Sequence, residues 1–408
     1  DQHIDNIKQQ LTAEQLYGMC MLCNLEHPND ELAVASLYVH KKVRVIEASA
    51  YVMVTKALVY YRLKGARLVD NIINVPNSII AKISRVEVAK QFLAPPPAEL
   101  VDELLSEGLI SPQEAEIAKS ISLASDITIE ADSGGHTDQG VALSLVPMVI
   151  AIKDQAMSTY QFTDPILIGL AGGIGSPAAV KAAFALGVDY VVTGSINQCS
   201  VESGASEAVK EILSQVGPHD MGIAPAGDMF EVGAKVQVVK KGLRFCERAN
   251  KLYDWYHRYD SIEALPDEII AQLESDYFSE SLTDVWAGIV AYKSQHKPEE
   301  IERAKDNPKH KMAMIFKTYF AKSTRWALAG DLSHKNDFQI HCGPAMGSFN
   351  QYMQQAGKVH WQKRRVVEIA ELLLEYKDLS GCKNYMMNTV VIKKLSEYSS
   401  DEIENLVL

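Results

Sequence analysis

The sequence predicts an α/β fold of the (β/α)8 TIM-barrel class with an additional helical subdomain. Three observations favour this class. Short apolar segments typical of strands alternate with helical segments through the first half of the chain. The apolar segments are largely continuous, which is typical of parallel strands buried on both faces. Two late strand segments end in turns of small residues, where barrels of this class bind phosphate groups.

Six segments have the composition of strands, and helical segments separate them. The strand segments are residues 17–25, 43–49, 77–84, 126–132, 165–170 and 189–193. The helical segments between them are residues 31–41, 55–64, 85–94 and 141–155. Parallel βα repeats form an open doubly wound sheet or a closed barrel. A closed barrel of this class has eight strands, and an open one exposes strand edges. We therefore expect the first two barrel strands to be missing from the supplied chain.

An insertion is predicted at about residues 95–124, between two βα units. Three consecutive prolines begin it, and a helical pattern follows at residues 99–107. Ser111 and Glu114 are spaced as a capping box, with Pro112 at the first helical position. We expect these residues to form an αα-hairpin.

The pattern changes after about residue 225, where charged helical patterns become dominant. We expect the aromatic residues of this region to form the core of a helical subdomain. They are Trp255, Tyr256, Tyr259, Tyr277, Phe278, Trp286, Phe316, Tyr319 and Phe320. The predicted division is a barrel at residues 1–225, a helical subdomain covering the active site at residues 226–375, and a small helical appendage at residues 376–408.

Composition excludes several classes of function. Of the 408 residues, 47% are hydrophobic and 23% are charged, as in ordinary globular proteins. The formal net charge of −12 disfavours nucleic acid as a partner, because phosphate binding needs a basic face. No apolar run reaches the roughly 18 residues that would predict a membrane span.

The six cysteines are scattered and do not form a dense disulfide framework. Together with the lack of an export leader, they predict a reducing, cytoplasmic compartment. Cys20 and Cys23 form one CxxC on a predicted strand, where this spacing directs the side chains to opposite faces. No second pair completes a zinc site, so we expect no metal.

The strongest functional signal is the segment 170–177, LAGGIGSP. A strand ends there in glycines, after which Ser176 caps a helix with Pro177 at its first position. Backbone N–H groups at such a junction bind anions without obstruction from Cβ atoms. GGIG does not match GxGxxG, which disfavours a Rossmann site. The next strand ends at Gly194 and Ser195, which gives two neighbouring turns of the kind that hold a phosphate. The predicted phosphate-binding residues are Ala171, Gly172, Gly173, Gly194 and Ser195.

Two further residues have the chemistry of a site. His136 follows two glycines at the tip of the fourth predicted strand, the end of a parallel barrel where catalytic groups collect. A histidine there exchanges protons near neutral pH. Lys82 lies inside an apolar strand, where a lysine is costly unless it is paired. It either balances an electron-rich flavin ring or extends along the strand end to water.

Five blocks resemble a known family, the trans-acting enoyl reductases of polyunsaturated fatty acid and polyketide synthases. These are FMN barrels similar to nitronate monooxygenases. The blocks are EADSGGHTD, LAGGIGSPAAVKAAFALG, VVTGSINQCSVESG, APAGDMFEVGAKVQV and NPKHKM. The resemblance covers roughly residues 15–375 and is most specific after residue 125.

The resemblance implies an FMN enzyme that reduces α,β-unsaturated thioesters carried on acyl carrier protein, with NADPH as hydride source. It implies a carrier-protein partner within a synthase complex and leaves the oligomeric state open, a homodimer included. It also implies site roles for particular residues. His136 matches the active-site histidine, Gly134 and Gly135 match the turn against the flavin, and Lys82 matches a lysine near the isoalloxazine. The phosphate turns match Ala171, Gly172, Gly173, Gly194 and Ser195.

Some positions are left without an assigned role. Relatives often have a flavin-contacting asparagine in the first predicted strand, but here the matching place is Cys20, with Asn24 four residues later. His341 lies in the predicted helical region and is expected to be structural. Docking of an acidic carrier protein would need a local basic patch. The clusters considered, each also interpretable as a solvated helix face, are Lys240, Lys241 and Arg244; Lys309 and Lys311; and Lys363, Arg364 and Arg365.

Three alternative functions stay open. A nitronate monooxygenase would use the same fold and flavin, with His136 as a base. A relative of inosine monophosphate dehydrogenase would need a nucleophilic cysteine, and Cys199 is the candidate. A non-catalytic docking protein of a synthase would bind carrier protein without a flavin.

Overall fold

The computed structural model describes residues 2–12, 17–25 and 27–374. These residues form two compact units. The sheet unit contains the described residues up to Asp132, residues 138–194 and residues 365–374. The helical unit contains residues 133–137 and 195–364. The predicted C-terminal appendage at residues 376–408 lies outside the described residues.

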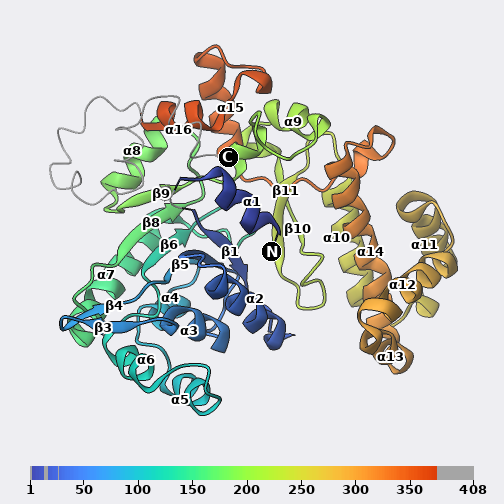
Figure 1. Cartoon of the computed structure of the whole chain (residues 1–408). Coiled ribbons are helices and arrows are strands. Elements are labelled where there is room, and N and C mark those ends of the chain that lie inside the picture. The colour runs from blue at the N-terminus through green and yellow to red at the C-terminus, as the bar shows by residue number, and fades with distance from the viewer. Residues whose placement is uncertain (1, 13–16, 26, 375–408) are drawn as a thin grey trace. The chain divides into compact units, whose positions relative to one another are not determined.

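A six-stranded parallel sheet is the centre of the sheet unit (Figure 1). Its strands are β1 (Met19–Leu22), β2 (Val45–Ser49), β5 (Ser78–Ile83), β6 (Asp126–Glu130), β8 (Leu167–Ala171) and β9 (Tyr190–Val192). They pair in chain order, and every pairing is parallel. Neighbouring strands in chain order, each separated by helix, are the topology of a (β/α)8 barrel. The six predicted strands and their parallel pairing are therefore confirmed.

Helices follow the strands as predicted. They are α2 (Pro28–His40), α3 (Lys56–Leu63), α4 (Val86–Phe92), α7 (Ala142–Tyr160) and α8 (Pro177–Ala185). On β5, Ile79, Ala81 and Ile83 are buried, whereas the alternate positions are only partly buried. The apolar face of the sheet is thus the face that packs against helices, and the other face carries the polar residues of the strands.

That second face is filled partly by Tyr190 of β9. Its hydroxyl lies 2.8 Å from Thr128 Oγ1 on β6, so the ring crosses the intervening strand β8. Gly169 of β8 makes this crossing possible, because a Cβ there would overlap the Tyr190 ring. The glycine is therefore required by packing and not by a turn.

The insertion forms the predicted helical hairpin from α5 (Ala98–Ser106) and α6 (Pro112–Ile117). The capping box is present, since Ser111 Oγ accepts from the Glu114 N–H at 3.2 Å and Glu114 accepts from the Ser111 N–H at 2.7 Å. A second hairpin, β3 (Arg67–Val69) with β4 (Ile72–Asn74), was not predicted. Asp70 and Asn71 both have positive φ in its turn, and such an Asp-Asn pair is a recognisable hairpin signal.

The helical unit contains a short antiparallel sheet that the charged helical pattern did not predict. Its strands are β10 (Met221–Pro225), β11 (Lys235–Val239) and β7 (Gly135–His136), with β11 in the centre. The prediction that charged helical patterns dominate after about residue 225 was wrong for β11. Its backbone is paired on both sides over a short stretch, and its flanks are charged.

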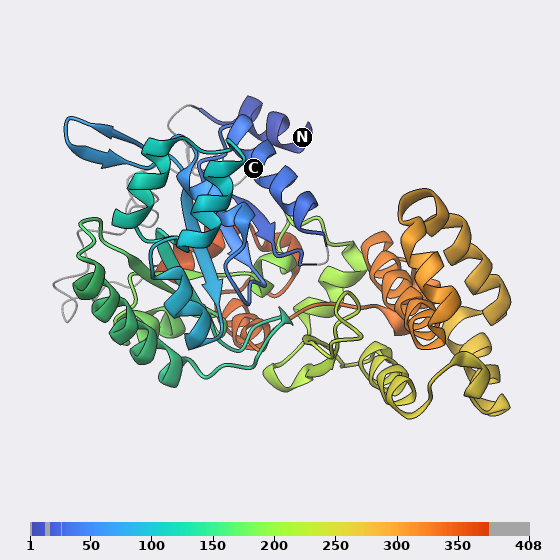
Figure 2. The same cartoon turned by 90° about the horizontal axis from the view of Figure 1, so that it is seen from below.

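The helices of this unit pack around a long central helix, α14 (Pro308–Ala329) (Figure 2). It contacts α10 (Phe245–Arg258), α12 (Leu282–His296) and α13 (Pro298–Asp306). The predicted aromatic residues lie in this core or pack against it, with Phe316 and Tyr319 fully buried, and Phe230 and Phe245 add to it. The other α-helices here are α9 (Glu207–Ser214), α11 (Asp267–Gln272) and α15 (Ala345–Gln355). No helix among the described residues is long and apolar enough to cross a membrane.

Candidate active site

The predicted phosphate turns lie at the ends of two paired strands of the sheet unit, β8 and β9. Ala171 is the last residue of β8, and its carbonyl accepts a hydrogen bond from Ala131 N at 2.9 Å. Gly172 and Gly173 follow with φ of +86° and +75°, a conformation that side chains disfavour. A Cβ on Gly172 would lie 2.8 Å from the carbonyl oxygen of Asp132. Gly172 is therefore required by the close approach of the two backbone segments.

Gly173 and Gly194 differ from Gly172, because a Cβ at either would meet no atom within 4 Å. Both turns thus leave open space over their backbone, as a phosphate cradle requires. The helix after the first turn begins as predicted: Ser176 Oγ accepts from Ala179 N at 3.3 Å, and Pro177 is the first residue of α8. Open backbone at glycine turns beside a helix N-terminus is the kind of site that binds a phosphate group.

Ser195, the last predicted phosphate residue, belongs to the helical unit. Its hydroxyl accepts a hydrogen bond from Gly343 N at 3.0 Å. The same side chain also forms a hydrogen bond with the Cys342 side chain.

Lys82 does not extend to water, because it is held between two glutamates. Its Nζ lies 3.2 Å from Glu47 Oε1 on β2 and 3.7 Å from Glu130 Oε1 on β6, the strands on either side of β5. Burial, the largest influence, acts to lower the pKa of Lys82, but the two carboxylates together raise it above its ordinary value. The side chain, 23% exposed, is therefore a fixed positive charge on the polar face of the sheet. Sequence reasoning found the lysine and missed both partners.

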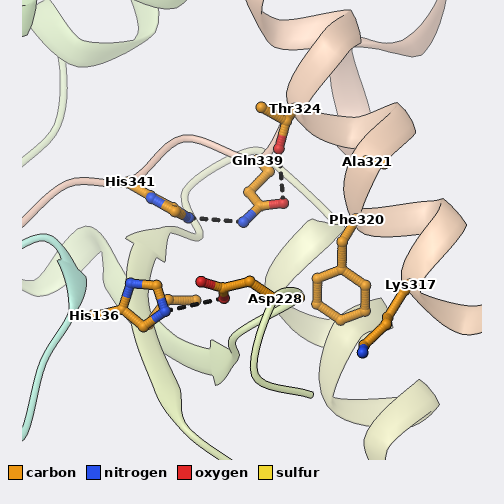
Figure 3. Close-up of a pocket in the computed structure, with 10 residues that line it drawn as sticks. His136, Asp228, Lys317, Phe320, Ala321, Thr324, Gln339 and His341 are labelled. Carbon is orange, nitrogen blue, oxygen red and sulfur yellow. Dashed lines mark hydrogen bonds and ion pairs between the residues drawn. The ribbon is translucent and has the colours of Figure 1, made fainter. Parts of the chain in front are cut away.

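His136 is the last residue of β7, and it pairs with Val236 of β11. Its Nε2 lies 3.0 Å from Oδ1 of Asp228, in the segment between β10 and β11 (Figure 3). Burial acts to raise the pKa of Asp228, but the hydrogen bond and charge of His136 outweigh it and lower that pKa. A carboxylate in this position fixes the orientation of the imidazole and stabilises its protonated form.

The two glycines before His136 set its position. A Cβ on Gly134 would lie 2.6 Å from Gly343 N, so only a glycine allows these backbones to meet. Gly135 has φ of +77°, and its α-carbon faces the ring of His341. This glycine pair is therefore explained by packing against the segment 341–343.

His341 was expected to be structural, and the structure places it in the same cavity as His136. It forms a bridge with Val238 of β11, and its Nε2 lies 2.7 Å from the side-chain nitrogen of Gln339. Thr324 Oγ1 in turn donates to Gln339 Oε1 at 3.1 Å. Burial, with a smaller contribution from the charge of His136, lowers the pKa of His341. His341 is therefore a neutral hydrogen-bonding group beside a histidine that is paired with a carboxylate.

The cavity that these residues share has a volume of about 400 Å³ and lies within the helical unit. His136, Asp228, Gln339 and His341 form one wall, and Phe320, Ala321 and Thr324 of α14 face them (Figure 3). A protonatable histidine, a neutral histidine and an apolar wall suit proton transfer to a largely uncharged molecule.

Cys199 is poorly suited to nucleophilic chemistry. Cys199 is fully buried, burial raises the pKa of its thiol, and its Sγ donates to Lys210 O at 3.6 Å. A buried thiol of raised pKa is a poor nucleophile, which argues against the dehydrogenase-like alternative. No group of three or more His, Cys, Asp or Glu among residues 2–12, 17–25 and 27–374 is arranged to hold a metal, Cys20 and Cys23 included.

The prediction that Lys363, Arg364 and Arg365 could form a basic docking patch is wrong for Arg364. Arg364 is 1% exposed, and its guanidinium donates to Asn350 Oδ1 at 2.8 Å and to Val359 O at 2.9 Å. It is therefore a core residue and not part of a docking surface. In the cluster of Lys309 and Lys311, Lys311 Nζ forms an ion pair with Glu263 Oε1 at 2.9 Å.

The sheet topology and the glycine turns define a protein of the (β/α)8-barrel class, and comparison with known proteins narrows this class. The solved enoyl reductase domain of MlnA, from the macrolactin biosynthesis cluster of Bacillus amyloliquefaciens, is 38% identical with a TM-score of 0.87. The match covers 91% of this chain and 84% of that domain. The chain belongs to this family of enoyl reductase domains of polyketide and polyunsaturated fatty acid synthases.

Two curated relatives support the same family. Polyketide biosynthesis protein PksE of Bacillus subtilis is 46% identical over 372 residues, which are 91% of this chain and 48% of that protein. A component of the polyunsaturated fatty acid synthase of Thraustochytrium sp. is 38% identical over 336 residues, 81% of this chain and 22% of that protein. The chain thus spans about half the length of the first relative and less of the second. Residues 259–338 match the family described as [acyl-carrier-protein] S-malonyltransferase, inserted helical domain.

Proposed function

We propose that the protein is an FMN-dependent enoyl reductase that acts in trans on α,β-unsaturated thioesters of an acyl carrier protein, with NADPH as hydride source. Polyketide or polyunsaturated fatty acid synthesis is the proposed setting. The observation that carries the proposal is the 38% identity to the MlnA enoyl reductase domain across 91% of this chain.

The proposed cofactor site uses residues of the sheet unit. The N–H groups of Gly172, Gly173 and Gly194 and the first turn of α8 would hold the FMN phosphate, since space over Gly173 and Gly194 is open. Lys82 would hold a positive charge toward the flavin ring, and Glu47 and Glu130 keep that lysine in place. Bound FMN supplies hydride to the β-carbon of the enoyl thioester.

The proposed proton chemistry belongs to the helical unit. His136, protonated and oriented by Asp228, would donate its proton toward the α-carbon or hydrogen-bond the enolate oxygen. His341, neutral and oriented by Gln339, would act as a second hydrogen-bonding group in the same cavity. Phe320 of α14 would give the substrate an apolar surface beside these two histidines.

Carrier protein and synthase are the proposed partners. Two observations support them: the relatives are named as parts of polyketide and polyunsaturated fatty acid synthesis, and the helical region matches a domain of an enzyme named for acyl carrier protein. The oligomeric state stays open, a homodimer included.

The test is a spectrum of the purified full chain, reconstituted with FMN and reduced by NADPH without oxygen. The proposal predicts that the flavin bands bleach and that crotonyl thioester restores them. A flavoprotein that ignores NADPH and oxidises an alkyl nitronate in air would be a nitronate monooxygenase instead. A chain that binds no FMN would overturn the proposal in favour of a docking protein without catalysis.

A further inference from the structure

A second cavity lies in the helical unit and has no role in the chemistry above. It has a volume of about 420 Å³ and is bordered mainly by α12 and α14. Two residues of α14, Lys317 and Ala321, border both this cavity and the one that contains His136. The two cavities are therefore neighbours, separated by one ridge of α14.

The spacing along α14 explains this arrangement. Residues Lys317, Phe320, Ala321 and Thr324 face the His136 cavity, as Figure 3 shows, which is a stripe at i, i+3, i+4 and i+7. The second cavity uses the adjoining stripe, which contains Met314, Lys317, Thr318, Ala321 and Arg325. The ridge between them consists of the flexible stem of Lys317 and the single methyl group of Ala321, so little material separates the cavities.

The floor of the second cavity is apolar. Val285 and Met314 are buried there, and Ile289 is partly buried. Gly288 lies in the middle of α12, where glycine costs roughly 1 kcal/mol relative to alanine. A Cβ on Gly288 would meet nothing within 4 Å, so helix packing does not require this glycine. It does keep the cavity open.

The carboxylates around this cavity already have partners of their own. Glu280 is paired with Lys322, Glu300 accepts from His310 at 2.9 Å, and Asp284 accepts from the Ser281 hydroxyl at 2.7 Å. Lys322 offsets the charge of Glu280, whereas the hydroxyl at Asp284 leaves that carboxylate charged, so a ligand would meet Asp284 as well as the cations at the rim.

Two of these cations, Lys293 and Arg325, border the same cavity on facing helices. Within the described part of the chain, neither is paired with a carboxylate. An apolar floor with unpaired cations at the rim fits a long, mostly neutral molecule that carries a negative group at one end.

We propose that this cavity binds the phosphopantetheine arm of the thioester substrate. Lys293 and Arg325 bind its phosphate, the arm lies over the floor at Gly288, and the thioester passes Ala321 into the cavity of His136. The inference rests on the proposed function, because it takes the substrate to be a pantetheine thioester. It adds the place where the arm binds and the residues that recognise its phosphate.

The test is calorimetric titration of the full chain with 4′-phosphopantetheine and with pantetheine, which differ only in the phosphate. We expect the chain to bind phosphopantetheine at least about tenfold more tightly. The double variant Lys293→Gln/Arg325→Gln should bind both molecules equally. The matched control, Lys251→Gln/Arg258→Gln, changes two exposed cations on α10 and should keep the preference. Equal binding by the unmodified chain, or a preference that survives in K293Q/R325Q, would overturn the inference.

A second pair of variants tests the passage at Ala321. Ala321→Trp adds a large ring at an exposed position between the cavities and should raise KM for crotonyl-phosphopantetheine about tenfold. Ala329→Trp changes an exposed residue of the same helix outside both cavities and should leave KM unchanged. An unchanged KM in A321W would contradict the passage.

The experiments distinguish a failure of the proposed function from a failure of the proposed arm site. If phosphopantetheine shows the expected preference but no enoyl thioester is reduced, the proposed function is wrong and the arm site stands. If enoyl thioesters are reduced but the phosphate makes no difference to binding, the proposed function stands and the arm site is wrong.

Discussion

The two units bring their polar residues together in different ways. In the sheet unit, Lys82 and its two glutamates lie on three successive parallel strands, so the alternation of each strand places them on one face. In the helical unit, His136 meets Asp228 and His341 only because β11 pairs with β10 along one edge and with both β7 and the segment at His341 along the other. The first cluster follows from local pattern, whereas the second depends on long-range antiparallel pairing.

The clusters also differ in charge. Lys82 has two carboxylate partners that keep it positively charged, which provides a fixed charge. The cavity of the helical unit holds a histidine paired with one carboxylate and a second histidine that burial keeps neutral. A fixed charge suits the binding of a cofactor, and exchangeable protons suit catalysis. The predictions below test this division.

The largest expected effect is on catalysis in the helical unit. His136→Gln should lower the rate of enoyl thioester reduction by roughly 10²- to 10⁴-fold, the usual contribution of a general acid. Reduction of the flavin by NADPH should be nearly unchanged, because that half-reaction does not use the proton of His136. Stopped-flow measurement of the two half-reactions separates these outcomes. If both fall together in H136Q, the histidine is structural for the whole site.

The next largest effect is on stability in the sheet unit. Gly172→Ala should destabilise the protein by about 3 kcal/mol, because φ is positive and the added Cβ meets backbone atoms. Gly194→Ala is the matched variant, and its added Cβ meets no protein atom. It should change the free energy of unfolding by less than about 0.5 kcal/mol while weakening FMN binding. Urea denaturation and flavin titration measure the two quantities. Tight FMN binding by G194A would remove Gly194 from the cofactor site.

Sequence reasoning was most successful where structure is local. Continuous apolar strands, the capping box at Ser111 and the helix start at Ser176 each depend on a few adjacent residues, and each is confirmed. The glycines of the two turns were found for the same reason, and the structure distinguishes those required by packing, such as Gly172, from those that leave open space, such as Gly173.

It failed where distant segments pair. β7 contains only two residues, and the segment at His341 forms a single bridge, so neither has a periodic pattern that a sequence can show. His341 was therefore assigned to a helical region. Arg364 was misassigned for a related reason, since its partners, Asn350 in α15 and the carbonyl of Val359 in a loop, give no sequence signal.

A smaller expected effect is the pH dependence of stability in the helical unit. Burial lowers the pKa of His341 in the folded state below its ordinary value of 6.5. The unfolded chain therefore takes up this proton before the folded chain does. The stability that neutral His341 contributes is present above the unfolded pKa and is lost as pH falls through it toward the lower folded pKa.

His341→Gln should remove this contribution, so its melting temperature should fall less than that of the unmodified chain between about pH 7 and pH 5. Differential scanning calorimetry at several pH values measures the slope. His219→Gln, an exposed histidine of the same unit, is the matched control for loss of an imidazole. An identical slope in H341Q would mean that folding does not lower the pKa of His341.

The smallest expected effect is the change in stability when a glycine is replaced, and this change has opposite signs in the two units. In the sheet unit, replacing Gly172 is costly because the backbone demands it. In the helical unit, Gly288→Ala should stabilise α12 by about 0.5–1 kcal/mol, since alanine favours helix and its methyl group meets open space. Urea denaturation of G288A measures this gain. A stabilised variant whose affinity for phosphopantetheine falls would show that the glycine keeps the cavity open at the expense of helix stability. A destabilised variant would mean that α12 requires the glycine for packing, and Gly288 would then be no evidence for an arm site.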